Sequence, residues 1–564
     1  MTMNKMIRLL TMLCMMTALP VLAGNTNDNR RRLLGASEES PVDATWLITN
    51  PSFETGDLTG WTMTPSEGSD MGVRGYDLSD RDGSFVANLY TWWSGVAIEQ
   101  VVGNVPAGIY EVSGVVATWE GYTVNFYAND HMVSAAGQGD CTGIRLATTV
   151  IVGNDGQLTI RADRTDINWW AEDRKDIEST RLGFLKLDDV RLTCKGLLDV
   201  SEQSDFTATA LNVDGLPQKV ALITINEDGP GSDGTKLISK YLKGKGYDFI
   251  GVSEDFNYHG SLMSELNGEY DCGTLRATLD ITHLSIPFDT DGLNLIWKRS
   301  KVRATNESWT KWNSTTSTDG NQFVKKGYRH YDMTLEGGLV IDVYVLHMDA
   351  GDVPDSRNKQ WRQLADAINA ADPNRPKLVI GDTNSRWTRE EIKANFADLL
   401  TNVTAKDAWV EMRREGIYPT TTMNDLADQT FANSFGTYEV VDKILYLNPI
   451  AENTLQLVPK GFRLEQDYTY GTVEGTDDGK QLGDHRPLVV DFACMRYQKV
   501  TTIIGDVNRD GSITIADVTA LVNVLLGKDD AEPYAYDHEA ADANADGSIT
   551  IADVTALVNV LLGK

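Results

Sequence analysis

Three short polar strings have the residue types needed for chemistry on a phosphate group. They occupy 254–259 (Glu-Asp-Phe-Asn-Tyr-His), 381–384 (Gly-Asp-Thr-Asn) and 483–487 (Gly-Asp-His-Arg-Pro). Each lies next to an apolar run typical of a buried strand, at 249–252, 377–380 and 488–490. Carboxylate, amide and imidazole groups at strand ends can hold a hard cation and move protons on phosphate oxygens. The sequence therefore predicts a phosphoryl-transfer site at the edge of a sheet.

A chain of 564 residues is too long for one core, and its length suggests about three or four domains. The strands that must position this site belong to one of them. Short alternating apolar stretches between turn residues predict an all-β sandwich over 44–196. Strand runs then alternate with helical spacing, as in Trp361, Leu364 and Ile368, which predicts an α/β domain over 206–493. After a connector at 494–502, the segment 511–528 recurs without change at 547–564, inside a small helical domain over 503–564.

The N-terminus predicts export. Lys5 and Arg8 precede an apolar run that ends at Ala23, which is typical of a signal peptide over 1–23. Residues 24–43 are polar and charged and predict a flexible leader. No other stretch approaches the roughly 20 apolar residues of a membrane span. We expect a secreted protein that is extracellular, associated with the cell surface or periplasmic.

The net charge limits the class of substrate, and the number of cysteines limits the possible disulfide bonds. The formal net charge is −30, which disfavours nonspecific nucleic-acid binding without excluding it, and is compatible with a small anionic substrate held by a metal. Cys141, Cys194, Cys272 and Cys494 remain after removal of the signal peptide. Domain boundaries favour the pairs 141–194 and 272–494, and free thiols are the alternative.

Each copy of the C-terminal repeat carries oxygen ligands at every second position, a turn glycine and a carboxylate at position twelve. This is the pattern of a calcium loop, so two Ca²⁺ are predicted, each followed by a helix. The ligand positions are Asp506, Asn508, Asp510, Ser512, Thr514 and Asp517, then Asp542, Asn544, Asp546, Ser548, Thr550 and Asp553.

This segment resembles a type I dockerin, a family that docks enzymes onto cohesin partners, so the resemblance implies a cohesin-like partner. Loop positions ten and eleven hold Ile515-Ala516 and Ile551-Ala552, where the family usually has Ser or Thr. Packing of the module against its own protein is therefore an alternative.

The N-terminal sandwich resembles the galactose-binding-like jelly roll that many carbohydrate-binding modules share. The resemblance rests on 50–54 (Asn-Pro-Ser-Phe-Glu), 60–61 (Gly-Trp) and 187–190 (Leu-Asp-Asp-Val). It implies a glycan ligand and a structural Ca²⁺ held by Glu54 and Asp189. Candidate sugar-stacking residues, for each of which a core position is the alternative, are Trp92, Trp93, Trp119, Trp169 and Trp170.

The middle domain resembles the endonuclease/exonuclease/phosphatase superfamily, the DNase I-like fold, over 206–493. Four motifs carry the likeness: Asn-Val-Asp-Gly-Leu-Pro at 212–217, the strings at 254–259 and 381–384, and Val-Asp-Lys-Ile-Leu at 441–445. The resemblance implies a four-layered α/β sandwich, in which two sheets pack face to face with helices outside and the active site lies at one edge.

The resemblance also implies roles for individual residues. Mg²⁺ (or Mn²⁺) would be held by Asn212, Glu254 and Asp484, with Asn226 as the alternative to Asn212. His347 would contact the phosphate, Asp382 would activate the attacking water and Asn384 would hydrogen-bond the phosphoryl oxygen. His485 would steady the phosphate charge while Asp442 orients its ring. Gly483 replaces the family's usual Ser, and His259 receives no role.

These features together predict a secreted metal-dependent phosphoesterase. It would hydrolyse a phosphodiester or phosphomonoester by in-line attack of water, and the two flanking modules would target it to a glycan and to a protein partner. Family members cleave DNA, RNA, sphingomyelin and inositol phosphates. The alternative is a glycan-adhesion protein, or a component of a polysaccharide-degrading complex, whose middle domain is a weakly active scaffold. A glycosidase would need two carboxylates across a sugar cleft, and no pair is stronger than those assigned to metal.

Overall fold

The computed structural model describes residues 29–563 apart from sixteen gaps. The gaps are 31, 93–94, 165–182, 214–218, 221–222, 225–231, 257–258, 275–289, 319–320, 322–323, 424–438, 472–479, 484, 501–502, 509–511 and 529–537. The signal peptide, Asn226, Asp484, Asp510, Trp93, Trp169 and Trp170 therefore lie outside the described residues. Within the described part of the chain, no helix combines the length and apolar character needed to cross a bilayer.

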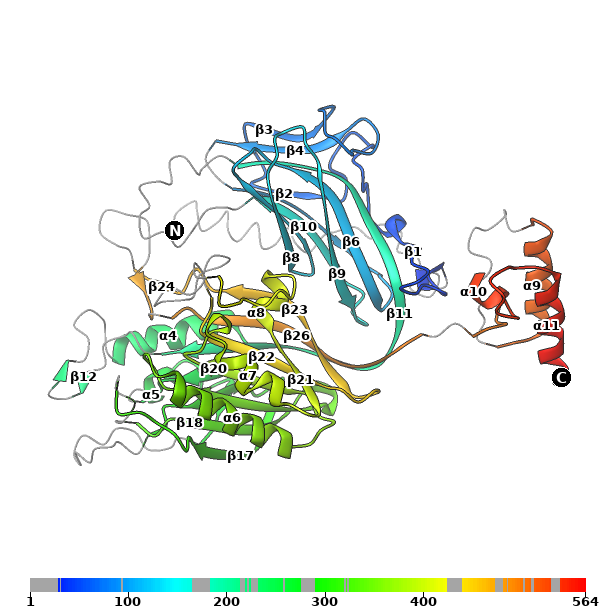
Figure 1. Ribbon diagram of the computed structural model, residues 1–564. Coiled ribbons are helices and arrows are strands. Elements are labelled where there is room, and N and C mark those ends of the chain that lie inside the picture. Colours follow the sequence, from blue (N-terminus) through cyan, green and yellow to red (C-terminus); the bar gives the residue numbers. More distant parts are fainter. Residues whose placement is uncertain are drawn as a thin grey trace.

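The N-terminal domain consists of two antiparallel sheets that share one core (Figure 1). In β7 (Thr123–Ala128), buried Val124, Phe126 and Ala128 alternate with partly exposed residues, which is the period of a strand covered on one face. The sheet that contains β7 has the order β2 (Thr62–Thr64), β5 (Val96–Val102), β10 (Leu158–Arg164), β7 and β8 (His131–Ala136). The other sheet contains β1 (Val42–Asp43), β3 (Asp70–Arg74), β4 (Val86–Thr91), β6 (Gly108–Ala117) and β9 (Ile144–Val152). The 3₁₀ turn η2 (Thr45–Leu47) follows β1.

One long strand, β11 (Gly183–Asn212), joins this domain to the next. Its first half pairs with β4 and β6, and its second half pairs with β14 (Phe249–Ser253) and β26 (Leu488–Lys499). The domain boundary near 196–206 is therefore a continuous strand. The connector expected from 494 begins later, because β26 continues to Lys499 opposite Leu198.

A buried arginine adds a second junction between the two domains. Arg413, 9% exposed at its side chain, donates to Asp130 Oδ2 at 2.8 Å and also to the backbone oxygens of Asp130 and Phe462. The Phe462 amide donates to the same carboxylate at 2.7 Å. Because each polar group in this contact is satisfied, the junction favours a fixed arrangement of the sandwich on the middle domain.

The middle domain packs two further sheets face to face. One has the order β15 (Tyr270–Cys272), β16 (Asn294–Lys298), β14, β11, β26 and β23 (Leu455–Leu464). The other has the order β17 (Arg303–Lys311), β18 (Gly327–Thr334), β19 (Val340–His347), β20 (Lys377–Asp382), β22 (Asp442–Pro449) and β21 (Val403–Asp407). At Gly251 the sheets approach so closely that a Cβ would lie 2.7 Å from Ile380 Cγ2. Two short ladders are β12 (Lys219–Val220) with β13 (Ile223–Thr224), and β24 (Thr469–Tyr470) with β25 (Lys480–Gln481).

Helices cover the outer sides of these sheets. From α4 (Ser232–Lys245) and α5 (His259–Leu262), Ile238 and Leu262 join a buried cluster with Val252 of β14. On the second sheet, α6 (Pro354–Ala370) buries Trp361, Leu364 and Ile368, which confirms the helical spacing predicted there. The remaining helical segments are η5 (Glu336–Gly338), η6 (Trp387–Arg389), α7 (Glu391–Asn395), η7 (Ala397–Leu399) and α8 (Ala408–Arg413).

The C-terminal module lies apart from the other two domains and consists of α9 (Ile515–Leu525), α10 (His538–Ala541) and α11 (Ile551–Leu561) (Figure 1). Its small core contains Val507, Leu521, Ala541 and Leu557. α9 and α11 each begin with a capping box, in which Thr514 pairs with Asp517 and Thr550 with Asp553. The repeated sequence thus forms two equivalent loop–helix units.

The described part of the predicted leader is not free. Leu33 is 0% exposed in the core of the sandwich, and β1 pairs with Thr193 and Cys194 of β11. Arg30 Nη1 also donates to Leu198 O at 2.9 Å. The prediction of flexibility is wrong from Asn29 onward, because apolar residues between the charges complete the core.

The predicted disulfides are also wrong, since all four cysteines are free. Cys141 is exposed at the surface of the sandwich, whereas Cys194 is buried in its core. Cys494 is buried between the sheets of the middle domain, and Cys272 lies at their edge beside His259. The members of each predicted pair therefore belong to different environments of their domain.

Candidate active site

Strand register places three predicted site residues in one row. His347 ends β19 and is paired with Asp382 at the end of β20, and the antiparallel partner of Asp382 is Asp442 in β22. Neighbouring strands lie about 4.8 Å apart, so the three side chains start close together. Gly381 permits this geometry: its φ is +139°, and a Cβ there would lie 2.1 Å from Leu346 O.

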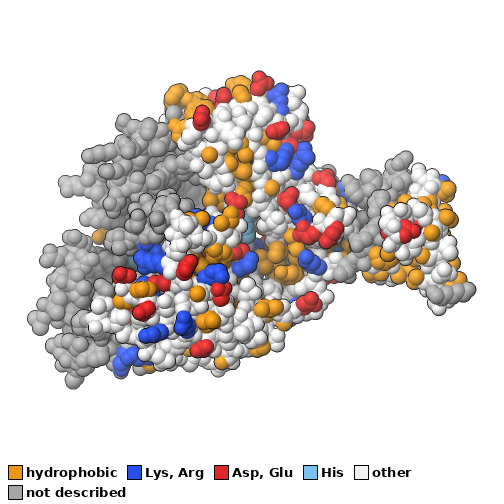
Figure 2. All heavy atoms as spheres, viewed as in Figure 1, with side chains coloured by type: hydrophobic (Ala, Val, Ile, Leu, Met, Phe, Trp, Pro, Cys, Tyr) orange, Lys and Arg blue, Asp and Glu red, His pale blue; other side chains and the backbone are white. Residues whose placement is uncertain are grey.

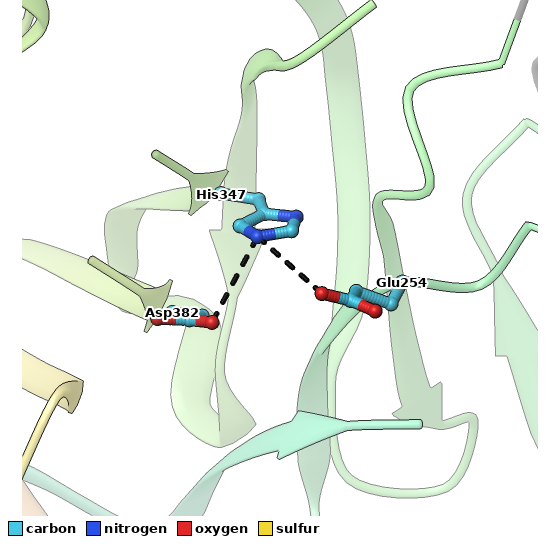
Figure 3. Close-up of side chains that lie close together, drawn as sticks. All are labelled: Glu254, His347 and Asp382. Carbon is cyan, nitrogen blue, oxygen red and sulfur yellow. Dashed lines mark ion pairs between the residues drawn. The ribbon is translucent and has the colours of Figure 1, made fainter. Parts of the chain in front are cut away.

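The facing sheet supplies Asn212 and Glu254. Asn212 pairs with Ser253, so Glu254 lies one residue beyond the paired ends of β11 and β14. Asn212 Nδ2 donates to Asp382 Oδ2 at 3.4 Å. His347 Nε2 lies 3.5 Å from Glu254 Oε1 and 3.8 Å from Asp382 Oδ2, between the two carboxylates (Figure 3). Glu254 has φ +64°, a strained conformation of the kind found where a side chain must be aimed.

His485 and Asn384 complete the predicted set. His485 Nδ1 hydrogen-bonds Asp442 Oδ2 at 2.6 Å, a contact that fixes the orientation of the ring. The Asn384 amide donates to Asp382 Oδ1 at 2.9 Å, which orients that carboxylate. The Asn384 side chain donates to Met348 O at 3.3 Å.

Lys326 is a site residue that sequence reasoning missed. It directly precedes β18, is 4% exposed, and its Nζ lies 2.9 Å from His347 Nε2 and 2.8 Å from Met348 O. A lysine before a strand usually extends into solvent, so the sequence around Lys326 does not indicate that its side chain is buried in a site. Burial lowers the pKa of the Lys326 ammonium, and the charges of Glu254 and Asp382 oppose that shift.

Burial and these neighbours shift the proton affinities of the site. Burial, followed by the charges of Lys326 and His485, holds the pKa of His347 well below its usual value. His347 is therefore neutral, Nε2 accepts from Lys326, and the two carboxylate contacts become ion pairs only if the ring gains a proton. Burial and then Asp442 raise the pKa of Asp382 against the opposing charge of His485. A raised pKa makes Asp382 a stronger base than an ordinary aspartate.

The donor set fits a hard divalent cation. Glu254, His347 and Asp382 each place a ligand atom within 4.8 Å of the others, and so do Asp382, Asp442 and His485. Together with the amide oxygen of Asn212, most of these donors are oxygens, which Mg²⁺ and Mn²⁺ prefer. The buried carboxylates would otherwise carry a concentration of negative charge that is costly to desolvate.

The two calcium ligands predicted in the sandwich, Glu54 and Asp189, already have protein partners. Asp189 forms ion pairs with Arg145 and Arg191, so its carboxylate is already neutralised. Glu54 instead accepts hydrogen bonds from two backbone amides of the loop at 84–85. Asp188 is 0% exposed, and its Oδ1 has no hydrogen-bond partner among the described residues. Asp188 is therefore better placed than Asp189 to supply a cation ligand, and the calcium site of the sandwich stays a prediction.

Four aromatic residues of the sandwich, Tyr76, Tyr90, Trp119 and Phe184, line a cavity of about 350 Å³. Trp119 stacks on Phe184 at 4.7 Å, and Tyr90 meets Trp119 edge-on at 5.5 Å. Trp92 is exposed beside Tyr90. Tyr76, Asp140 and Lys186 add polar groups to the lining.

The C-terminal loops bring their polar side chains inward. Asp542 accepts from the amides of Asp546 and Gly547, and Asp553 Oδ1 accepts from the Asn544 amide at 3.1 Å. In the first loop Asp517 Oδ1 accepts from the Asn508 amide at 3.0 Å. The second loop therefore gathers carboxylate oxygens around its turn, as a calcium loop requires, and the turn of the first loop lies outside the described residues.

Comparison with known proteins identifies the C-terminal module. Residues 504–562 match the family model of the Dockerin type I domain, so the chain carries a dockerin domain at its C-terminal end. Curated relatives of the chain are sphingomyelinases of Mycobacterium bovis and Mycobacterium tuberculosis, 27% identical over 288 residues. The match covers 51% of this chain and 52% of each relative, so the chain spans about half the length of the curated relatives it matches.

Similar solved structures each cover about half of the chain. D. rerio TDP2 complexed with a single-strand DNA product is 16% identical, with a TM-score of 0.36, over 51% of this chain and 99% of that one. An endonuclease/exonuclease/phosphatase from Bacteroides vulgatus is 16% identical, with a TM-score of 0.34, over 51% and 98%. Sphingomyelinase C from Streptomyces griseocarneus is 13% identical, with a TM-score of 0.35, over 51% and 99%.

Proposed function

We propose that this protein is a metal-dependent phosphodiesterase whose active site lies at the edge of the two sheets of the middle domain. The observation that carries the proposal is the row of His347, Asp382 and Asp442 in strand register, opposite Glu254 of the facing sheet. The similarity to mycobacterial sphingomyelinases supports the same class of reaction.

Asn212, Glu254 and Asp484 would hold the metal ion. When bound, Mg²⁺ would offset charge on a phosphoryl oxygen. Asp382, oriented by the Asn384 amide, would take the proton from the attacking water, and its raised pKa suits it to that task.

Positive groups on the other side of the row would stabilise the extra charge of the transition state. Lys326 would supply an ammonium next to His347, and Asp442 would orient the ring of His485 toward the phosphate. The ring of His347 would contact the phosphate in its neutral form, so the positive charge near the phosphate would come from the other groups. Most of the rate enhancement would then come from positioning and electrostatics.

The substrate we propose is a phosphodiester of a lipid headgroup, with sphingomyelin as the first candidate. The curated relatives carry that name, and the net charge of −30 disfavours long polyanions such as nucleic acids. A phosphomonoester is the alternative.

Hydrolysis of sphingomyelin, bis(p-nitrophenyl) phosphate, p-nitrophenyl phosphate and DNA would test the proposal. We expect the two non-nucleic-acid diesters to turn over with Mg²⁺ and to stop with EDTA, and turnover to return when Mg²⁺ is added back. Preference for the monoester or for DNA would contradict the proposed substrate, and equal rates with EDTA would contradict the metal.

The two flanking modules would target a secreted enzyme. The dockerin domain would bind a cohesin-like protein, and the exposure of Ile515 and Ile551, 71% each, supports an external partner rather than packing on the same chain. Hydrophobic side chains are visible over the surface of this module in Figure 2. The aromatic cavity around Trp119 would bind a glycan by stacking on sugar rings. Loss of glycan-array binding in Trp119→Ala, with Trp312→Phe in the middle domain as control, would support the second role.

A further inference from the structure

A cysteine, a histidine and an aspartate form a hydrogen-bonded chain at the edge of the first sheet of the middle domain. Asp255 follows β14, His259 begins α5 and Cys272 ends β15. His259 Nδ1 lies 2.5 Å from Asp255 Oδ2, and His259 Nε2 lies 3.5 Å from Cys272 Sγ. Neither His259 nor Cys272 takes part in the proposed phosphodiesterase mechanism.

The arrangement is that of an activated thiol rather than a metal site. The two ring nitrogens point in opposite directions, one to the carboxylate and one to the sulfur, so the three ligand atoms do not converge on one point. Asp255 is 2% exposed at its side chain, and its backbone amide is held by Gly292 O at 2.9 Å. A buried, fixed carboxylate of this kind sets the orientation and tautomer of the imidazole.

The neighbours of His259 favour its protonated form. Burial of His259 opposes its protonation, but the hydrogen bonds with Asp255 and Cys272 outweigh burial and raise the pKa of His259 to about 10. An imidazolium beside a cysteine stabilises the thiolate, which is the nucleophilic form. Cys272 is partly exposed, so a small reagent can reach the sulfur.

We propose that Cys272 is a nucleophilic modification site that reacts with small disulfides and other soft electrophiles, with His259 as its counter-ion and Asp255 as the residue that positions His259. In the reaction with a disulfide, the Cys272 thiolate attacks one sulfur and forms a protein–small-molecule S–S bond. The S–S bond of the reagent breaks, and the departing thiolate takes the proton of the His259 imidazolium. The products are a mixed disulfide, a free thiol and a neutral imidazole.

The same chain offers an internal reference. Cys141 is exposed in the sandwich, and none of its contacts with the described residues resembles the chain at Cys272. Its alkylation rate at each pH provides the reference for Cys272 in the same sample.

The test is alkylation of the full-length mature protein by iodoacetamide at pH 5.5 to 8.5, with each cysteine peptide quantified by mass spectrometry in the same sample. We expect the rate at Cys141 to fall steeply with pH, and the rate at Cys272 to change by less than about threefold. At pH 6 Cys272 should react at least about tenfold faster than Cys141. Incubation with glutathione disulfide at pH 6 should then give a mixed disulfide at Cys272 alone.

Two results would overturn the proposal. One is a pH slope at Cys272 equal to that at Cys141. The other is a Cys272 that stays unlabelled in the native protein at every pH and is labelled only in urea. In His259→Gln and Asp255→Asn we expect the flat profile to become steep, and circular dichroism would verify that each variant is folded. A flat profile that persists in folded His259→Gln would also refute the role of the histidine.

Discussion

The middle domain and the dockerin domain both gather acidic residues, but they do so in different ways. In each dockerin loop the ligands come from one continuous stretch, such as Asp506 to Asp517, and a helix cap fixes the last of them. In the active site the residues come from Asn212 to His485 and meet only because strands of two sheets are in register. A site built from one loop depends on its ion, whereas a site built on a packed core exists before its ion arrives.

The cores of the two regions differ in the same sense. In the described part of the dockerin domain, four apolar residues are fully buried, while the middle domain buries a continuous cluster between its sheets. Removal of metal should therefore destabilise the dockerin domain and inactivate the middle domain without unfolding it.

Replacement of His485 should give the largest loss. His485→Ala removes the imidazole that Asp442 orients, and we expect kcat on a phosphodiester to fall about 100–1000-fold with an unchanged melting temperature. The measurement is steady-state kinetics with differential scanning calorimetry. His330→Ala, which changes a histidine of β18 outside the site, is the control and should retain activity.

Removal of Ca²⁺ should affect the dockerin domain and not the middle domain. At 100 times its Kd, an ion stabilises the folded state by about 2.7 kcal/mol, so EGTA in excess Mg²⁺ should destabilise α9 and α11 by about that amount. Hydrogen exchange would measure the loss of protection. If turnover by the middle domain falls in parallel, the two regions are not independent.

Glu254→Gln should raise the Mg²⁺ requirement. The substitution keeps the size of a proposed ligand and removes its charge, so we expect metal affinity to drop about 10–100-fold. A titration of activity against Mg²⁺ would show a shifted midpoint, and excess Mg²⁺ should restore much of the rate. An unshifted midpoint would exclude Glu254 as a ligand.

Arg413→Ala should loosen the sandwich from the middle domain by the smallest amount. It removes hydrogen bonds to Asp130 and Phe462 in a nearly buried contact, which we expect to cost about 1–2 kcal/mol. Arg74→Ala, which breaks the solvent-exposed pair with Asp70, should cost less than about 1 kcal/mol. Chemical denaturation followed separately in each domain would compare the two, and equal losses would argue against a fixed junction.

The same contrast explains what the sequence could predict. The dockerin loops were predictable because spacing alone fixes their geometry. The strand runs before Glu254 and Asp382 were predictable because strands buried on both faces are apolar throughout. The role of each site residue could be assigned only from the family resemblance. The pairing register of strands that are distant in sequence leaves no local pattern in the sequence.

Features that depend on tertiary context were missed. Lys326 looks like a solvated strand end, and only the packing of β18 beside β19 brings it to His347. Leu33 lies in a charged segment, so composition masked its place in the core. β11 passes through two domains without a turn, and no composition change could show that one strand serves both.

Turnover of bis(p-nitrophenyl) phosphate by Asp382→Ala at saturating Mg²⁺ would show whether Asp382 activates water in a metal-assisted site. Asp398→Ala, which alters an exposed carboxylate paired with Lys393, is the matched control. We expect Asp382→Ala to lose about 100–1000-fold in kcat while the control keeps the wild-type rate. A folded Asp382→Ala that turns over as fast as the control would rule out Asp382 as the base.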